Sequence, residues 1–254
     1  MVKNEKQKIW KGLQHTLALN IAGFAKGPTI TKEQAIEDLD ISQCKDILEE
    51  IMHNQDKGHL LLIPHFGSFE LLAQYWCVYD KPFAILARGF GLPRLDKLWN
   101  SKREKNGVTL FGRKGGFKEI LKFIDQGKNV AILFDQNVKR SHSIFVDFFG
   151  IPASTTKTIG LASQKTKCKI FFATMIPIAN GKYRLIAHKI KSPLEREGTH
   201  EQQIHDTILE SHKYLEYYVA KYPEQWFWLH RRFKTRPSGE IENFYDQKLF
   251  PEDV

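Results

Sequence analysis

The chain has 254 residues, of which 42% are apolar and 26% charged, and its formal net charge is +9. This is the composition of an ordinary globular protein, and no internal repeat, low-complexity tract or Pro/Ser/Gly linker divides it, which favours one domain. The charge predicts attraction to a polyanion (nucleic acid, an anionic membrane surface or an acidic protein) without choosing among them. Cys44, Cys77 and Cys168 have neither disulfide nor metal-ligand spacing, so we expect a reducing, cytosol-facing compartment and no metal site.

Residues 1–58 are predicted to form a helical N-terminal segment. Five apolar residues recur there at spacings of three and four, which places them on one helical face: Trp10, Leu13, Leu17, Ile21 and Phe24. The longest nearly apolar run, 16–25, is about half of the roughly 20 residues that span a bilayer. Two interpretations stay open, a helix lying in a membrane interface, with lysines beside its apolar face, and a terminal helix packed on the domain. Thr31 with Gln34 then forms a capping-box pattern that opens a helix, and another helix is expected from about Ser42 to Gly58.

Beyond residue 58, short apolar runs alternate with stretches of helical periodicity. Buried strands are expected at 60–64, 82–88, 107–111, 129–135 and 168–178, and helices at 69–79, 92–106, 115–126 and 155–166. This alternation predicts an α/β domain over 59–237, with a mostly parallel mixed central sheet flanked by helices. We expect an antiparallel edge strand at 183–190, a long helix at 199–219 and a C-terminal tail over 238–254.

Polar residues stand where three of the predicted strands end. His65 follows the first strand, Arg88 the second, and Asp135 the strand at 129–135. Sites in α/β domains lie at the carboxyl ends of strands, so these residues are candidates for a common site. Purely structural roles are the alternative, since Arg88 could simply pair with an acidic neighbour and Asp135 could cap the turn that Asn137 continues.

The stretch HFGSFE (65–70) brings a histidine and a carboxylate into apolar surroundings. If Ser68 caps a helix that begins at Phe69, the turn at Gly67 allows Glu70 to reach one ring nitrogen of His65. The other nitrogen would then be a general base for a hydroxyl, and backbone N–H groups near Gly67 would bind an oxyanion. The alternative is a structural histidine that merely finds a carboxylate partner.

The same stretch is an H-x4-E motif and resembles that of the lipid A biosynthesis (late) acyltransferases, within the H-x4-D/E glycerolipid acyltransferase superfamily. Four further stretches resemble blocks of this family in the same order: ILARGFGLPRLDKLWNSKR, NVAILFDQN, VDFFGIPASTTKTIGLA and EQWFWLHRRFKTRP. The resemblance covers roughly residues 55–237. The H-x4-E motif alone is weakly specific, whereas five blocks in order are strongly specific.

The resemblance implies transfer of a fatty acyl chain from a thioester, acyl carrier protein or coenzyme A, to a hydroxyl of a lipid A precursor, with no other cofactor. It implies that His65 is the base, that Glu70 orients it, and that Arg88 and Asp135 belong to the site. It also implies work at the cytoplasmic face of a bacterial inner membrane. Family members usually begin with an apolar anchor helix, whereas only a short amphipathic segment is present here. We therefore expect peripheral or weak attachment, with dependence on a partner, or a truncated or diverged start, as the alternatives. An acceptor other than lipid A, such as another glycolipid or a lysophospholipid, and an inactive basic lipid- or nucleic-acid-binding module are the alternatives.

Bases and aromatics interleave near the C-terminus, where five basic residues follow Trp226 and Trp228: His230, Arg231, Arg232, Lys234 and Arg236. Such a pattern fits single-stranded nucleic acid or a membrane interface. The resemblance selects the membrane, so we expect no nucleic acid, with Arg231 and Arg232 facing substrate or lipid and both tryptophans mostly in the core.

Overall fold

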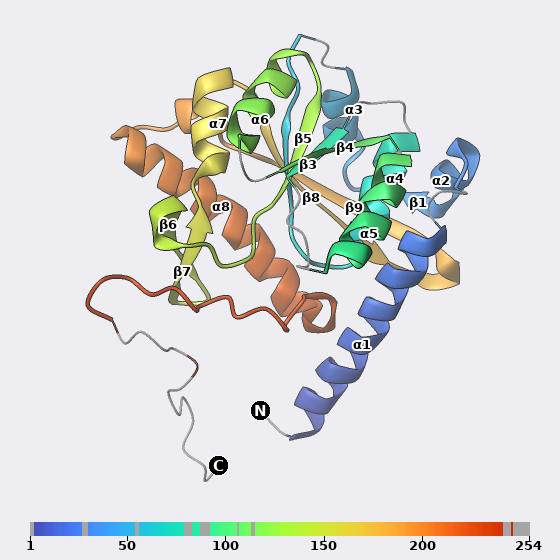
Figure 1. Cartoon of the computed structure of the whole chain (residues 1–254). Helices are drawn as coiled ribbons and strands as arrows, with labels where there is room; N and C mark the ends of the chain where they lie inside the picture. Colours follow the sequence, from blue (N-terminus) through green and yellow to red (C-terminus); the bar gives the residue numbers. More distant parts are fainter. Residues whose placement is uncertain are drawn as a thin grey trace.

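The computed structural model describes residues 3–26, 30–53, 56–78, 83–86, 92–105, 107–112, 115–240 and 245. Its centre is a seven-stranded sheet in the order β1-β9-β8-β2-β5-β3-β4 (Figure 1). Strands β8, β2, β5, β3 and β4 are parallel, β9 is antiparallel to β8, and β1 is parallel to β9. The bounds are β1 (Leu39–Asp40), β2 (Leu60–Ile63), β3 (Phe83–Leu86), β4 (Val108–Phe111), β5 (Asn129–Leu133), β8 (Ile170–Pro177) and β9 (Tyr183–Ile190). The predicted α/β domain with a mostly parallel sheet is confirmed.

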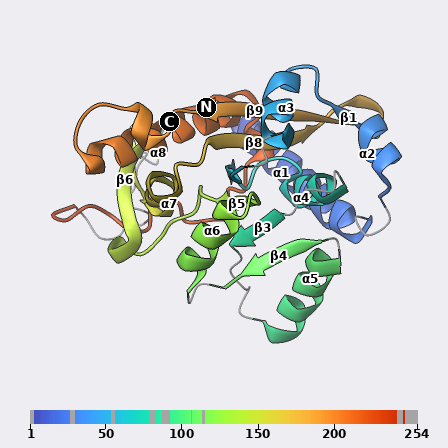
Figure 2. The same cartoon turned by 90° about the horizontal axis from the view of Figure 1, so that it is seen from above.

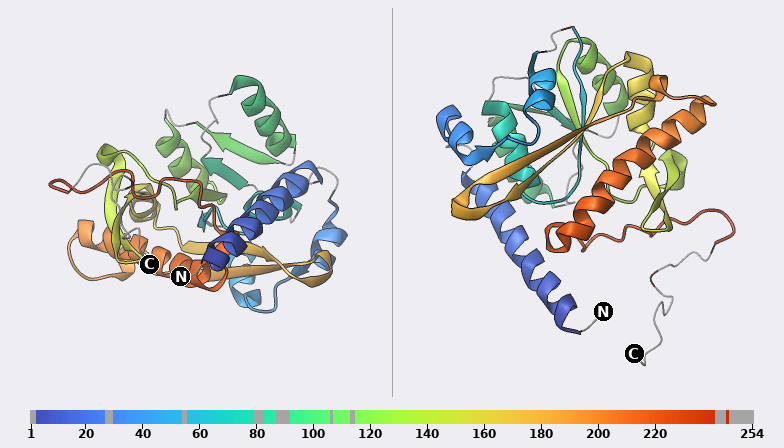
Figure 3. Two further views of the ribbon diagram at one scale, coloured as in Figure 1. Left: turned by 90° about the horizontal axis from the view of Figure 1, so that it is seen from below. Right: turned by 180° about the vertical axis from the view of Figure 1, so that it is seen from behind.

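Helices cover both faces of this sheet, as the view from above shows (Figure 2). On one face lie α6 (Gly116–Asp125), α7 (Thr158–Thr166) and α8 (His200–Lys221), and on the other α2 (Lys32–Asp38), α3 (Lys45–His53) and α4 (Phe69–Val78). The remaining helices are α1 (Lys3–Lys26), which runs along one side of the molecule, and α5 (Pro93–Lys105), which lies next to β4 at the sheet edge (Figure 3). A short 3-10 turn, η5 (Pro223–Gln225), follows α8.

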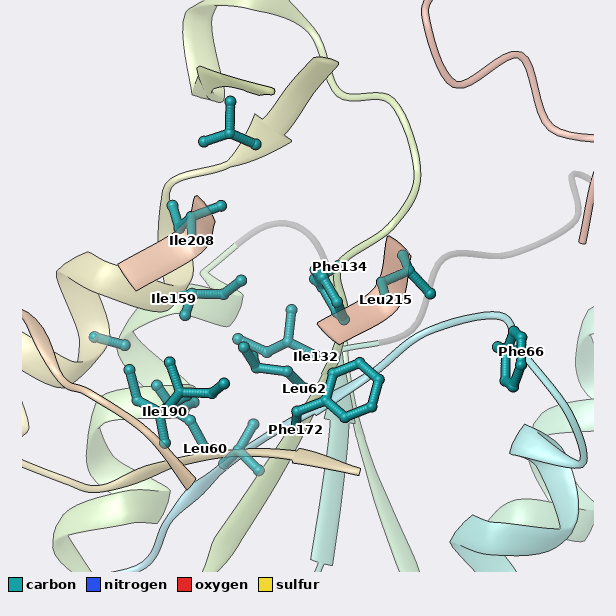
Figure 4. Packing of buried hydrophobic residues seen from close by; sticks show 14 of the residues in the cluster. Leu60, Leu62, Phe66, Ile132, Phe134, Ile159, Phe172, Ile190, Ile208 and Leu215 are labelled. Atoms are coloured by element: carbon teal, nitrogen blue, oxygen red, sulfur yellow. The ribbon is translucent and has the colours of Figure 1, made fainter. Parts of the chain in front are cut away.

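The double coverage explains the unbroken apolar runs in the sequence. Along β2, Leu60 and Leu62 face α6, α7 and α8, where they pack with Ile132 and Phe172 (Figure 4). Leu61 and the residues that share its face pack against α2, α3 and α4. A parallel strand buried on both faces needs apolar side chains at every position.

The predicted N-terminal helix is confirmed, and so is the Thr31 capping box. The helix packs on the domain by one edge, because Leu13 and Phe24 are buried. Its other edge is open to solvent, with Trp10 50% and Ile21 62% exposed. Within the described residues, no helix is both long and apolar enough to cross a membrane.

Two features differ from the sequence-based expectations. Strand β9 is not the sheet edge, because the short β1 pairs with it. The helix expected at 155–166 begins only at Thr158, since the residues before it form a hairpin of β6 (Ser143–Phe148) and β7 (Ile151–Thr156). The hairpin turns at Phe149 (φ 55°) and Gly150 (φ 76°), the two left-handed positions of a tight I′-type turn. The first of these positions is usually asparagine, aspartate or glycine, so a phenylalanine there gives no sequence signal for the turn.

Candidate active site

His65 and Asp135 lie side by side at the carboxyl edge of the sheet. Strands β2 and β5 are parallel neighbours with Ile63 opposite Leu133, so the residues two positions later leave the sheet together. The Nδ1 atom of His65 lies 2.7 Å from Oδ1 of Asp135, and the backbone N–H of His65 donates to Oδ2 at 3.0 Å. Two of the three predicted strand-exit residues therefore form one hydrogen-bonded pair.

The Asp135 carboxylate is almost fully enclosed, with 2% of its side chain exposed. Its Oδ2 also accepts a hydrogen bond of 2.9 Å from the indole Nε1–H of Trp226. Burial alone would raise the pKa of Asp135, but the attraction of His65 and the bonds from His65 and Trp226 outweigh it and lower the pKa to about 2. Asp135 is thus a buried acceptor that is ionised at neutral pH.

This carboxylate fixes the tautomer of His65. An ionised carboxylate only accepts hydrogen bonds, so Nδ1 carries the proton and Nε2 has the free lone pair. The side-chain amide of Gln136 lies 3.2 Å from Nε2 and donates to it. The ring packs beside Phe69 and Phe227, and 17% of its side chain is exposed. A nitrogen that is oriented and unprotonated in this way can accept the proton of a hydroxyl.

Glu70 does not contact His65 in this way, and the predicted His65–Glu70 pairing is wrong for this structure. Its carboxylate faces α5, where Arg103 Nη2 lies 2.5 Å from Oε1 and Trp99 Nε1 lies 3.4 Å from the same oxygen. The physical reason is that α4 begins at Phe69 and carries Glu70 toward α5, while the ring of His65 is already held by Asp135.

A small pocket lies beside the Glu70–Arg103 pair. Its volume is about 10 Å³, roughly the space that one water molecule needs. Strand ends, α4 and α5 line it: Ile63, Phe69, Glu70, Ala73, Ile85, Arg103 and Leu133. The lining is mostly apolar, with Glu70 and Arg103 as its charged members.

The turn at Gly67 is tighter than the sequence indicates. Gly67 has φ +62°, and a Cβ there would lie 2.2 Å from the carbonyl oxygen of Met175, so only glycine fits. Its N–H donates to the Gln225 carbonyl at 2.9 Å, and the Ser68 N–H donates to the Met175 carbonyl at 2.7 Å. These two N–H groups are therefore already bonded within the protein, which contradicts the expectation that they bind an oxyanion.

Arg231 and Arg232 differ although they are neighbours. Arg231 is exposed, with its guanidinium 5.9 Å from the ring of Tyr245. Arg232 is 1% exposed, donates to the Ser154 carbonyl at 2.6 Å and contacts His212 Nε2 at 2.9 Å. The expectation that Arg232 faces substrate or lipid is wrong, because its guanidinium is enclosed beneath the β6–β7 hairpin.

The two tryptophans also differ. Trp226 is buried, as expected, whereas Trp228 is 45% exposed, and its indole N–H donates to the Pro223 carbonyl at 2.6 Å.

Burial lowers the pKa of His212 to about 3, so this histidine is neutral beside Arg232. The basic C-terminal segment is thus partly a structural element of the core and only partly a surface.

Asn137 fastens the C-terminal segment to the loop after β5. Its backbone N–H donates to His230 Nε2 at 2.7 Å, and its side chain exchanges hydrogen bonds with Thr235.

The predicted site residue Arg88 lies outside the described residues. Among the residues that the structure does describe, no group of three or more His, Cys, Asp or Glu side chains could hold a metal ion.

Sequence reasoning missed four contributors to this region: Asn20, Arg103, Gln136 and Trp226. Trp226 lies in the C-terminal stretch EQWFWLHRRFKTRP, but nothing in that stretch says that its indole reaches a carboxylate 91 residues earlier. Arg103 and Gln136 likewise lie in the stretches ILARGFGLPRLDKLWNSKR and NVAILFDQN, but nothing local indicates their partners, which are distant in sequence, as is that of Asn20.

Comparisons with known proteins place this site in a family. A family model described as bacterial lipid A biosynthesis acyltransferase matches residues 1–235. The chain is 28% identical over 206 residues to a lipid A biosynthesis myristoyltransferase of Escherichia coli (81% of this chain, 62% of the relative). It is 30% identical over 189 residues to a lipid A biosynthesis lauroyltransferase of the same organism (73% and 59%). The matched part thus spans less than two thirds of these relatives' length. The chain belongs to the bacterial lipid A biosynthesis acyltransferase family.

Proposed function

We propose that the protein is an O-acyltransferase that moves a fatty acyl chain from a thioester to a hydroxyl of a lipid A precursor. The observation that carries this proposal is the His65–Asp135 pair, with Nδ1 and Oδ1 2.7 Å apart, in a member of this family. The relatives named above are lipid A acyltransferases, which supports the acceptor class. Acyl carrier protein is the proposed donor, with coenzyme A as the alternative carrier.

In the proposed reaction, His65 Nε2 takes the proton of the acceptor hydroxyl in place of the hydrogen bond from Gln136. The alkoxide oxygen attacks the thioester carbonyl, and the C–S bond of the resulting tetrahedral intermediate breaks. The thiolate of the carrier then takes the proton back from His65, so that ester and free thiol leave together. Asp135 holds Nδ1–H and stabilises the imidazolium that forms between these steps.

Direct transfer of this kind needs no covalent enzyme intermediate. The Nε2 atom of His65 contacts a glutamine amide, whereas a covalent mechanism needs a nucleophile such as serine or cysteine within reach of the base. Both described free thiols, Cys44 and Cys168, are buried, and burial raises the pKa of each. This supports attack by the acceptor hydroxyl itself.

An exposed apolar edge beside the site supports work at a lipid surface. We define this edge by Trp10 and Ile21 of α1 with Leu95 and Leu98 of α5, all of which are at least 36% exposed. The two helices meet where Phe24 stacks on Trp99, with 3.8 Å between the ring centroids. Exposed lysines near the start of α1 suit anionic headgroups. We propose peripheral attachment at the cytoplasmic face of the inner membrane through this edge.

A basic rim on the other side of the site supports an acidic donor protein. We define this rim by five exposed residues of the loop after β5, the turn after β7 and the C-terminal segment: Lys139, Arg140, Lys157, Arg231 and Lys234. Two of these segments are tied together, because Arg140 donates to the Arg236 carbonyl at 2.6 Å. Acyl carrier protein is acidic, so the rim is its proposed docking surface.

The test is acyl transfer from labelled acyl carrier protein to a tetra-acylated lipid A precursor by wild type and His65→Ala. We expect transfer by wild type and a loss of roughly 10²–10⁴-fold in His65→Ala, the usual contribution of a general base. Circular dichroism checks that the variant is folded. Replacing the carrier with acyl coenzyme A, and the acceptor with a lysophospholipid, identifies each substrate. Full activity of His65→Ala would refute the mechanism.

A further inference from the structure

A buried side chain of helix α1, Asn20, reaches the active site and is 5% exposed. Its Nδ2 donates to the carbonyl of Gly67 at 2.7 Å, and its Oδ1 accepts from the backbone N–H of Glu70 at 3.3 Å. Its Nδ2 also lies 3.0 Å from the carbonyl of Thr16 on the same helix. One side chain of α1 therefore bridges the middle of the turn after His65 and the first turn of α4.

Other elements hold the rest of that turn. The Phe227 N–H donates to the His65 carbonyl at 3.0 Å, and the Thr174 hydroxyl donates to the Phe66 carbonyl at 3.0 Å. The N–H groups of Gly67 and Ser68 are bonded to the C-terminal segment and to β8. Asn20 supplies the partners on the α1 side, so the turn is fixed between three separate parts of the chain.

A second contact from α1 reaches the same region one helical turn later. Phe24 stacks on Trp99 with an angle of 8° between the ring planes. Trp99 in turn points its indole N–H toward the Glu70 carboxylate at 3.4 Å. Asn20 and Phe24 are four residues apart, which places them on one face of α1. This face therefore touches Glu70 through its backbone and, by way of Trp99, through its side chain.

We propose that Asn20 is a positioning residue for His65, which makes α1 a part of the active site as well as an attachment helix. This inference rests on the proposed function. The side-chain amide of Asn20 supplies one donor, for the Gly67 carbonyl, and one acceptor, for the Glu70 N–H. Asp offers no donor to Gly67, and Leu, of similar volume, offers neither group. Without these bonds the turn can shift, and a displacement of about 1 Å in a catalytic group costs roughly 10²-fold in rate.

The experiment compares wild type with Asn20→Leu, Asn20→Asp and the control Ser163→Ala. Ser163 is also buried on a helix and donates to a backbone carbonyl, that of Cys168 at 2.9 Å, but it lies in α7 and forms no part of the site. We expect kcat to fall roughly ten- to hundredfold in both Asn20 variants, with KM for the acyl donor changed less than about twofold. Ser163→Ala should lower the melting temperature comparably and keep wild-type kcat.

The ring signals of His65 provide a readout that does not depend on turnover. In protein labelled with ¹⁵N-histidine, we expect Asn20→Leu to shift or broaden the Nδ1–H resonance of His65, and Ser163→Ala to leave it unchanged. An inactive wild type with this same pattern would refute the proposed substrates and support the positioning role. The positioning role would be overturned if a folded Asn20→Leu variant kept the ring signals of His65 and the kcat of wild type. It would also be overturned if Ser163→Ala lowered kcat as much as Asn20→Leu.

Discussion

Two carboxylates lie close to the end of β2, and each is paired with a basic side chain, yet the two pairs are built differently. Asp135 is joined to His65 and also accepts the indole N–H of Trp226. Glu70 is joined to Arg103, with its backbone N–H held by Asn20. Both pairs are largely enclosed, with side-chain exposures of 17% and 2% for His65 and Asp135, and 13% and 9% for Arg103 and Glu70.

The difference lies in what each base can do with a proton. An imidazole gains and loses a proton near neutral pH, whereas a guanidinium stays charged. The His65–Asp135 pair can therefore take part in proton transfer through its imidazole, whereas the Arg103 guanidinium stays charged and joins α5 to Glu70 of α4. Sequence proximity is thus a poor guide to pairing here, because the carboxylate five residues from His65 pairs with Arg103, whereas the one seventy residues away pairs with His65.

The largest expected difference between the pairs is in activity. Asp135→Asn should reduce kcat roughly 10²–10⁴-fold, because an amide no longer fixes the tautomer of His65 or stabilises its charged form. Glu70→Gln should act mainly on stability, lowering the free energy of unfolding by about 1–3 kcal/mol through the charge-assisted bonds lost to Arg103. Single-turnover rates and urea unfolding of both variants measure the two effects.

A double variant sharpens this test. Because the pairs share no hydrogen bond, the logarithms of the rate losses from Asp135→Asn and Glu70→Gln should add. Glu70→Gln should instead couple to Arg103→Met in unfolding experiments, since each removes the partner of the other. A different result would contradict this division. If Glu70→Gln lowered the transfer rate as much as Asp135→Asn at unchanged stability, and the double variant were no slower than either single variant, Glu70 would share the function of the His65–Asp135 pair.

Most of the fold was predictable from the sequence for a physical reason. Strands buried on both faces produce continuous apolar runs, and β2, β5 and β8 begin and end close to the predicted limits. The same runs place His65 and Asp135 at strand exits. The β6–β7 hairpin was not predictable in this way, because its strands are only partly buried and its turn contains Phe149 where glycine or asparagine is usual.

The pairing within the site depends on sheet order, which composition does not encode. The chain forms β3 and β4 before it returns to place β5 beside β2, so the neighbour of His65 comes from the fourth of the five parallel strands. Glu70 is nearer along the chain, but the start of α4 directs it to α5. Long-range partners such as Trp226 and Asn20 are known only once these elements are packed.

The Asp135–His65 pair should also affect stability at acid pH. The pKa of Asp135 is about 2 in the folded protein and 3.8 in an unperturbed aspartate, so the folded state favours the ionised form. The resulting stabilisation is present above about pH 4 and is lost as the pH falls toward 2, a change of about 2 kcal/mol. Urea unfolding from pH 6 to pH 3 should therefore show a steeper acid loss in wild type than in Asp135→Asn. Equal slopes would mean that the pair does not favour the carboxylate.

The smallest expected effect isolates the contribution of Trp226 to the Asp135 pair. Trp226→Phe removes the indole N–H that Asp135 Oδ2 accepts but leaves both bonds from His65 in place. A single hydrogen bond to a charged group contributes about 1.5–3 kcal/mol. If roughly half of this contribution is felt in the transition state, kcat should fall about three- to twelvefold.

Trp228→Phe is the matched control, because its indole donates only to the Pro223 carbonyl and its side chain is 45% exposed. It should change kcat less than about twofold, a difference of no more than roughly 0.4 kcal/mol. Because Trp226 supports Asp135 and not Glu70, its loss should also be smaller in an Asp135→Asn background than in wild type. An equal loss in both backgrounds would mean that Trp226 acts by packing against Phe148 and not through the carboxylate.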